Sequence, residues 1–497
     1  MDLPPGGSAY SVLRKASDAD YDAEWKDLHL NTDGTNLLVH SGISLGDTPE
    51  FRVYGWEVTD AKRYFSIAVG SAGPETVEFT LDGVRAGLID YATYSYSFGE
   101  NALNSNTGQR NNAFGYQALY SNTTAFYNSA FGYQALYFNT GASNSAFGHA
   151  ALRSNTTGEY NNAFGHYALY SNTTASYNNA FGYYALFSND TGQYNSAFGY
   201  AALRSNTTAS SNSAFGHLAL YSNTTGASNN AFGYQALYSN TTASYNNAFG
   251  YYALFSNTTA SYNSAFGHYA LRSNTTASYN NAFGYYALYS NTTGEYNNAF
   301  GYVALRSNDT ASYNSAFGHS ALFSNTTGQY NNAFGYKALF SNTTGEYNSA
   351  FGYKALNSNT TGQYNSAFGH QALYLSTGNR NHAFGYLAGD SITTGSDNLC
   401  IGYDVDVSAA AVTDEFRLGN TNSNATTLLW GDMANNRLGI GVSSIPAYKL
   451  VLGGLANMDF GVEDCDTAGA TEAAWIKVVY DLGGTPTTGY IRIYATT

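Results

Sequence analysis

The sequence has little charge and almost no cysteine. Only 11% of its 497 residues are charged, and the formal net charge is −14. Proteins that bind nucleic acid rely on basic patches, so nucleic acid is not an expected partner. The two cysteines, Cys400 and Cys465, lie in dissimilar contexts. We therefore expect free thiols and not a disulfide framework.

Long hydrophobic runs and proline are also scarce. No run of 18 or more apolar residues occurs, so we expect no transmembrane helix and no membrane insertion. The N-terminal MDLPPGGS has neither the basic nor the apolar region of a secretory signal peptide. None of the six prolines lies between Pro74 and Pro446. This absence is typical of a backbone whose N–H groups nearly all donate to a ladder.

A 17-residue repeat fills most of that proline-free stretch. One copy runs from Phe232 to Ala248, with the sequence FGYQALYSNTTASYNNA, and Phe249-Gly250 opens the next. Three spacings near the ends are 16 residues, each with a shortened Asn-Thr-Thr segment, which marks that segment as a turn. Fixed self-similarity at this period indicates a solenoid, with one coil per repeat.

The residue types favour strands over helices in each coil. Tyr, Phe and Thr favour strands, whereas Gly and Ser-Asn interrupt them. We predict two short strands per coil, one around Tyr-Asn-Asn-Ala-Phe and one around Tyr-x-Ala-Leu-Tyr, with turns at Gly and at Ser-Asn-Thr-Thr. A β-branched residue at Gly250 should disrupt the corner, because Gly there is expected to have a backbone conformation that such residues avoid.

Stacking of the coils predicts ladders of identical residues about 4.8 Å apart. Asn side chains should form a hydrogen-bonded ladder, and Phe and Leu should form the core ladders. The core residues that we predict include Phe114, Leu119, Phe131, Phe232, Leu237, Phe249 and Phe368.

The apolar content of one coil is small, with one Phe, one Leu and two Ala as its constant members. Aromatic residues such as Tyr116, Tyr120 and Tyr177 would then leave a long aromatic face in water. Large exposed patches usually mark interfaces, and a closed oligomer avoids open-ended growth. We therefore favour a homotrimer over a single flattened solenoid.

The repeat resembles two families. Asn/Ser-Ala-Phe-Gly, which becomes Asn398-Leu-Cys-Ile-Gly402 at the end, resembles the Ser-Val-Ala-Ile-Gly motif of trimeric autotransporter adhesin heads, which are trimeric β-rolls. The longer string YNNAFGYQALYSNTT is similar to repeats in bacteriophage tail fibre proteins. The resemblance covers about three-fifths of the chain, and it implies the architecture more specifically than the biology.

The regions beside the repeat also resemble tail fibre chains. Gly6–Leu13 with Lys15–Trp25 resembles a segment near the start of such chains, and Asn436–Leu450 resembles the junction before their C-terminal chaperone. Strands are expected at 51–56, 64–69 and 76–81, and near the C-terminus at 474–480 and 489–494.

The predicted fold class is all-β: a long parallel β-solenoid (β-roll or β-helix) of 17-residue coils, trimeric, with small β domains at both ends. Four parts are expected: a β domain over residues 1–90 that attaches to the particle or else caps the solenoid, the solenoid shaft over 91–403, degenerate repeats and a junction over 404–453, and a β tip over 454–497.

Five histidines recur every third coil, 51 residues apart: His166, His217, His268, His319 and His370. Three coils rise about 14 Å, so the spaced histidines of one chain cannot share a metal. Three chains could each contribute one histidine to an axial ring, but duplication of a three-coil block explains the spacing better. No cofactor is expected.

No catalytic constellation is evident in the repeat. Its five acids, Glu159, Asp190, Glu295, Asp309 and Glu346, are scattered over distant coils, unlike the paired carboxylates of glycosidases. The Asn-Thr-Thr triplets match the glycosylation sequon but are better explained as turns. We expect a non-enzyme.

Recognition is expected in the C-terminal region, which is richest in varied aromatic residues. Trp475, Tyr490, Arg492 and Tyr494 are the predicted receptor-binding residues, because aromatic and Arg side chains are frequent at binding hot spots. The alternative is that these strands fill a small trimer core.

Two classes of function remain. The first is a structural virion protein, a trimeric phage tail fibre made in the host cytoplasm that binds a tail or baseplate protein and a host cell-surface glycan or protein. The second is an extracellular protein: a secreted adhesin, a filament or an ice-binding solenoid. The lack of an export signal favours the first.

Overall fold

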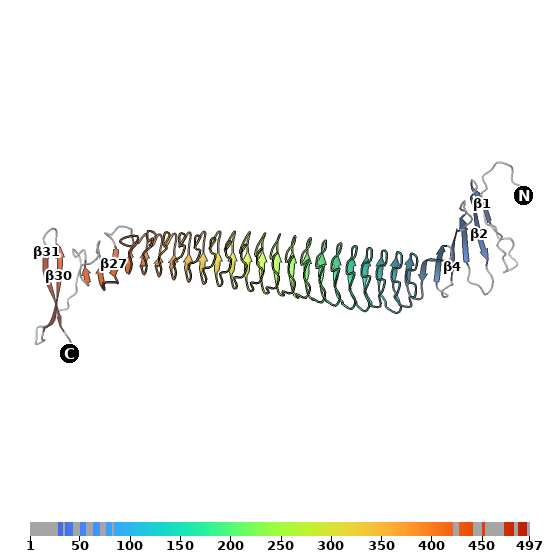
Figure 1. The fold of residues 1–497 in the computed structure, drawn as a ribbon, viewed down its shortest axis with the longest axis horizontal. Helices are drawn as coiled ribbons and strands as arrows, with labels where there is room; N and C mark the ends of the chain where they lie inside the picture. Colours follow the sequence, from blue (N-terminus) through green and yellow to red (C-terminus); the bar gives the residue numbers. More distant parts are fainter. Residues whose placement is uncertain are drawn as a thin grey trace. The chain divides into compact units, whose positions relative to one another are not determined.

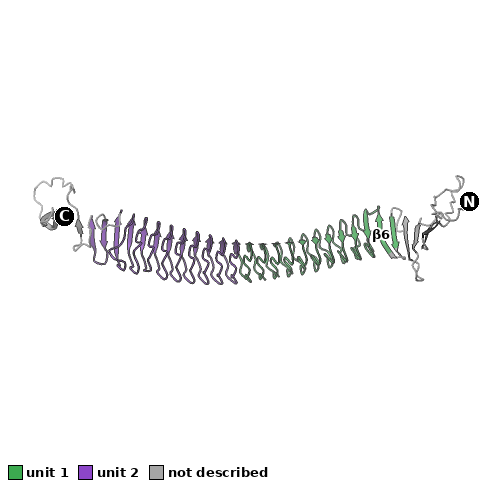
Figure 2. Cartoon of the chain, turned by 90° about the horizontal axis from the view of Figure 1, so that it is seen from above, with its two compact units in different colours: residues 1–262 green, residues 263–497 purple. Residues whose placement is uncertain are grey.

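The computed structural model describes residues 28–32, 35–42, 50–55, 63–69, 76–81, 84–420, 427–440, 450–452, 472–481 and 486–494. These residues form strands, turns and bends, with no helix among them. The chain divides into two compact units, residues 1–262 and residues 263–497 (Figure 2). Both units contain the repeated coil.

The first unit begins with an antiparallel meander in which consecutive strands pair in chain order. Three of its strands, β3, β4 and β5, coincide with the segments predicted at 51–56, 64–69 and 76–81. The last strand, β7, then pairs in parallel with the first coil strand, β8. The meander comprises β1 (Leu28–Thr32), β2 (Thr35–Gly42), β3 (Glu50–Gly55), β4 (Arg63–Val69), β5 (Thr76–Leu81), β6 (Val84–Asp90) and β7 (Ser95–Phe98).

The rest of the first unit is a parallel solenoid with one three-residue strand per coil, drawn as one short arrow and one loop each (Figure 1). Neighbouring strands pair in register, so that Phe lies beside Phe and Ala beside Ala. The strands are β8 (Asn112–Phe114), β9 (Ser129–Phe131), β10 (Ser145–Phe147), β11 (Asn162–Phe164), β12 (Asn179–Phe181), β13 (Ser196–Phe198), β14 (Ser213–Phe215), β15 (Asn230–Phe232) and β16 (Asn247–Phe249).

The second unit continues with the same coil and ends in antiparallel strands. Parallel pairing extends to β26, after which β26–β27 and β27–β28 are antiparallel, β28–β29 is parallel, and β30–β31 is a separate antiparallel pair. The strands are β17 (Ser264–Phe266), β18 (Asn281–Phe283), β19 (Asn298–Phe300), β20 (Ser315–Phe317), β21 (Asn332–Phe334), β22 (Ser349–Phe351), β23 (Ser366–Phe368), β24 (His382–Phe384), β25 (Leu399–Gly402), β26 (Glu415–Gly419), β27 (Thr427–Asp432), β28 (Arg437–Ile440), β29 (Leu450–Leu452), β30 (Glu472–Asp481) and β31 (Pro486–Tyr494). The predicted all-β solenoid of 17-residue coils is confirmed.

The prediction of a second strand in each coil is wrong. In the coil Phe232–Ala248 the segment Tyr234–Tyr238 is a run of turns. Gln235 and Leu237 have φ values of 53° and 52°, in the left-handed region, so the backbone cannot extend there. Such a conformation costs a Leu about 1–2 kcal/mol. Here it directs the Leu237 N–H to the carbonyl oxygen of Ala253 in the next coil, at 3.0 Å.

The core of each coil is small and partly polar. In the same coil the buried residues are Ala236, Leu237, Asn240, Ala243, Asn246 and Ala248. We number coil positions from 1 at Phe232 to 17 at Ala248. Positions 5, 6, 12 and 17 thus supply the apolar core, while positions 9 and 15 place an asparagine inside it.

The asparagine at position 9 belongs to a buried amide ladder. Asn240 Nδ2 donates to Asn223 Oδ1 of the preceding coil at 2.8 Å and to the carbonyl oxygen of Ala243 at 3.0 Å. Its Oδ1 accepts from Asn257 Nδ2 of the next coil at 2.9 Å. This is the asparagine of the Asn-Thr-Thr triplet, and it is fully buried, as its role in closing the turn requires.

The asparagine at position 15 forms a second ladder, whereas the sequence predicted a single asparagine ladder. The backbone N–H of Asn246 donates to Asn229 Oδ1 at 3.0 Å, and Asn246 Nδ2 donates to the carbonyl oxygen of Ala260 at 2.8 Å. The two ladders together satisfy buried backbone groups that have no partner in a strand. A buried polar group without a partner costs about 1–3 kcal/mol.

Glycine is required at position 2 for two reasons: the backbone has a positive φ there, and the next coil leaves no room for a Cβ atom. Gly233 and Gly250 have φ values of 140° and 143°. A Cβ atom on Gly233 would lie 2.4 Å from the carbonyl oxygen of Gly250 in the next coil. A residue with a Cβ atom would be strained at this φ and would also clash with the next coil, so only glycine fits this column.

We expect Gly233→Val to destabilise the solenoid by at least about 2 kcal/mol, because it combines backbone strain with overpacking. Thermal unfolding followed by circular dichroism measures this loss. Thr242→Val is the control, since it introduces the same side chain at an exposed turn position. Equal melting temperatures for the two variants would contradict the glycine argument.

Candidate interaction surfaces

The outward side of the coil strand carries rows of aromatic rings. Side chains alternate there: Asn246 and Ala248 point into the core, whereas Tyr245, Asn247 and Phe249 are exposed or half-buried. The tyrosine or histidine at position 3, after the glycine, is also on the outside. We call the surface formed by coil positions 14, 16, 1 and 3 the aromatic face.

The rings on this face stack along each unit. In the first unit the Phe232 ring centroid lies 4.6 Å from that of Phe215 and 4.7 Å from that of Phe249, with nearly parallel planes. In the second unit Tyr313 and Tyr330 are 4.9 Å apart at 3°. These distances match the strand spacing, so in-register pairing alone produces the ladders.

The predicted core residues separate into two groups. Leu119 and Leu237 are fully buried, because position 6 points into the coil. The phenylalanine ladder exists but lies on the aromatic face and not in the core of the chain: Phe114, Phe131, Phe232 and Phe249 are half-buried, and Phe368 is 38% exposed. Position 17, an alanine, points inward in the same strand, so alternation turns position 1 outward.

The aromatic face carries almost no charge. Over residues 111–262 in the first unit and 263–379 in the second, none of its four coil positions holds Asp, Glu, Lys or Arg. The titratable side chains at these positions within the same residues are tyrosines and the histidines at position 3. Tyr116 and Tyr177 lie on this face, whereas Tyr120 occupies position 7 on another side of the coil.

The histidines take the place of tyrosine within the position 3 ladder. His217 stacks between Tyr200 and Tyr234, each with a ring centroid 5.1 Å away. His149 and His166 are neighbours at 4.7 Å. Burial, and then the adjacent His149, lower the pKa of His166. Among the described residues, no three His, Cys, Asp or Glu side chains are grouped closely enough to hold a metal ion.

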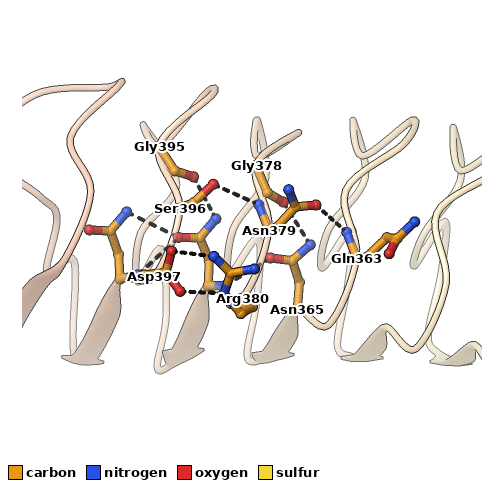
Figure 3. Close-up of polar contacts among 10 residues, drawn as sticks. Gln363, Asn365, Gly378, Asn379, Arg380, Gly395, Ser396 and Asp397 are labelled. Atoms are coloured by element: carbon orange, nitrogen blue, oxygen red, sulfur yellow. Dashed lines mark hydrogen bonds and ion pairs between the residues drawn. The ribbon is translucent and has the colours of Figure 1, made fainter.

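An open groove of about 750 Å³ lies where the tyrosine ladder at position 14 ends, in the second unit. The ladder stops at Tyr364, and the following coils place Arg380, Asp397 and Asp414 at the same position. The Arg380 guanidinium donates to both carboxylate oxygens of Asp397, with Nη2 at 2.8 Å from Oδ2 (Figure 3). This pair lowers the pKa of Asp397.

The groove was not predicted from the sequence. The signal was present, because aligning the repeats shows Tyr replaced by Arg and then by Asp at a single position. At position 16 the same coils change from Ser366 to His382 and Leu399.

A second cluster of acids lies in the last coils of the second unit. Burial raises the pKa of Asp390 to about 6, and the charges of Asp406 and Asp404 add to the shift. Asp406 is itself buried and accepts hydrogen bonds from the backbone N–H groups of Ser391 and Val407.

Asp390 should make the second unit less stable as pH rises. Its pKa in the folded chain is above the ordinary value of 3.8, so the folded state holds this proton more tightly. The stabilisation is complete below pH 3.8 and is lost as pH rises through about 6. We expect Asp390→Asn to raise the melting temperature at pH 7, with a smaller gain at pH 4. A gain that is equal at both pH values would contradict the assignment.

The predicted receptor-binding residues fall on β30 and β31, which coincide with the strands predicted at 474–480 and 489–494. The register pairs Trp475 with Arg492 and Lys477 with Tyr490, so these four positions share one face of the hairpin. Tyr494 pairs with Glu472 beyond an irregularity in the register.

Cys400 is a free thiol in the core, at a position that alanine fills in the preceding coils. Burial raises its pKa, so the thiolate that would make it reactive is disfavoured. Cys465 lies outside the described residues.

The part of the chain that the structure describes contains no helix long and apolar enough to cross a membrane. Comparisons of the chain with protein-family models, with curated proteins and with solved structures find no match.

Proposed function

We propose that this chain is a structural virion protein, the subunit of a homotrimeric tail fibre that projects from a phage particle and binds a host surface. In this proposal the solenoid is the shaft, residues 1–90 attach to a tail or baseplate protein, and the C-terminal residues contact the receptor. The repeat resembles both families, but the resemblance of both flanking regions to tail fibre chains supports this assignment over an extracellular adhesin.

The uncharged aromatic face is the observation that carries the proposal. A Phe ring repeats at position 1 of each coil from β8 to β24, position 3 of these coils carries Tyr or His, and Tyr302 and Tyr313 are still 49% and 46% exposed in the single chain. Monomeric proteins rarely leave a contiguous aromatic surface in water. Three copies related by a common axis would bury the face of each against the others and close the assembly.

The described coils suit a spacer more than an enzyme. Their backbone N–H groups donate from coil to coil, and their polar core side chains are amides whose hydrogen bonds are used within the ladders. Ice binding is less consistent with this arrangement. At the exposed turn, Thr241 Oγ1 donates to the carbonyl oxygen of Thr258 at 3.1 Å, so that hydroxyl already has a partner in the next coil.

The trimer predicts a particle of about 160 kDa, three times the 53.3 kDa chain. We expect Tyr302→Glu to shift the mass toward the monomer, because it would place one negative charge per chain inside the interface. Analytical ultracentrifugation measures the mass. Thr327→Glu, at an exposed turn, is the matched control and should leave the trimer intact. A soluble monomer formed by the intact chain would contradict the assembly.

The virion assignment predicts that mass spectrometry of purified particles from the source detects this chain as a stoichiometric component. Replacing Tyr490 and Arg492 by Ala should abolish attachment of those particles to host cells while leaving the trimer intact, with Thr487→Ala as the control on the same strand. Absence of the chain from particles would overturn the function. Unchanged attachment would place recognition elsewhere in the chain.

A further inference from the structure

The charged side chains of the coils are sorted onto two sides. Over residues 111–262 in the first unit and 263–379 in the second, every Lys and Arg is at coil position 4 or 7, and every Asp and Glu is at position 10 or 13. The acids are the five that are scattered over the repeat, and the cations are Arg153, Arg204, Arg272, Arg306, Lys337 and Lys354.

These two sides border the aromatic face. Positions 4 and 7 follow position 3 along the coil, and the Lys337 Nζ lies 5.5 Å from the centroid of the Tyr336 ring on that face. Position 13 directly precedes position 14, where Tyr347 follows Glu346. The aromatic face therefore has a cationic edge, formed by positions 4 and 7, and an acidic edge, formed by positions 10 and 13.

The acids have no ion-pair partner in their own chain. Within the residues that the structure describes, none of the five forms an ion pair with a Lys or Arg. Cations contact aromatic rings, as in Arg306, whose Cζ lies 5.5 Å from the centroid of the Phe323 ring. Lys337 and Glu346 are half-buried and Asp309 is exposed, so these charges are open to a neighbouring molecule.

Opposite edges meet only if neighbouring copies run in the same direction. Around a common axis along the stacking direction, the cationic edge of each copy lies beside the acidic edge of the next. Two antiparallel copies joined through their aromatic faces would instead place each edge beside its own kind. Like charges placed together cost free energy, so the sorting of charge disfavours the antiparallel arrangement.

We propose that ion pairs between copies fix the direction and register of the homotrimer, an inference that rests on the trimer of the proposed function. In the second unit, Arg306 at position 7 and Asp309 at position 10 share one coil, and Lys337 at position 4 and Glu346 at position 13 share another. Rotation about the axis keeps equal coils at equal heights. Arg306 then pairs with Asp309 of the next copy, and Lys337 with Glu346 of the next copy. Exposed ion pairs add little affinity, so their role is to select the arrangement.

Charge reversal tests the pairing on the purified full-length chain. Arg306→Glu with Lys337→Glu makes both edges acidic in these coils. We expect the dissociation constant of the trimer, from sedimentation equilibrium in urea that partly dissociates the parent, to rise at least tenfold. Adding Asp309→Arg and Glu346→Lys reverses both edges and should restore it to within threefold. Lost ring contacts would not be repaired by this addition, so a failed rescue, or no initial weakening, overturns the proposal.

Cross-linking tests the direction of the copies, in a Cys465→Ser background. Lys337→Cys combined with Glu346→Cys should give covalent trimers with a short bismaleimide on a denaturing gel, because each copy joins both neighbours. Either cysteine alone should leave single chains, since equal edges do not meet. Covalent dimers of a single variant would indicate antiparallel copies and overturn the proposal, as would a double variant that does not cross-link.

The two proposals fail separately in these measurements. A parent chain that sediments as a monomer would overturn the trimer of the proposed function. A parent trimer whose edge charges can be reversed without effect would overturn the ion pairs alone.

Discussion

The buried asparagine amide is the interaction on which the coil depends. A 17-residue coil that contains only three strand residues leaves most of its backbone polar groups in turns, where no strand partner exists. The carbonyl oxygen of Ala243 illustrates the solution, since it accepts from Asn240 Nδ2 in its own coil and from Asn229 Nδ2 in the preceding one. Asn240 also bonds to the position 9 amides of the coils before and after it, whereas Asn229 Oδ1 accepts the backbone N–H of Asn246 in the next coil. Without these side chains the turn from position 9 to position 15 would bury unpaired carbonyl groups.

This solution limits the apolar core. In the coil Phe232–Ala248 asparagine occupies two of the six inward positions and alanine three, so Leu237 at position 6 is the one large apolar side chain buried in this coil. The bulky aromatic residues are consequently placed outside, where stacking on the next coil buries only part of each ring. The same geometry that satisfies the backbone therefore creates the surface that another copy of the chain would cover.

Much of the fold followed from the sequence because the period is explicit. The repeat length, the turn at Asn-Thr-Thr and the glycine corner are visible in the residues, and the structure has all three. The error at Tyr234–Tyr238 came from strand propensity, which cannot reveal that Leu237 takes a left-handed conformation to reach the next coil. The outward position of Phe232 was missed because hydrophobicity, and not alternation within the strand, was used to assign the core. The groove depends on how consecutive coils differ, and reading one consensus coil conceals such differences.

The direction of the hydrogen bonds also determines how the coils resist force. The backbone bonds of Leu237, Ser239 and Thr241 all connect one coil to the next, as do the Asn240 and Asn246 amides. Tension along the stacking direction therefore loads every bond of one interface at the same time. A pull across that direction at a free end would instead open the bonds one after another. Coils stacked in this way are mechanically strong along their own axis and weakest where the first or last coil can be peeled away.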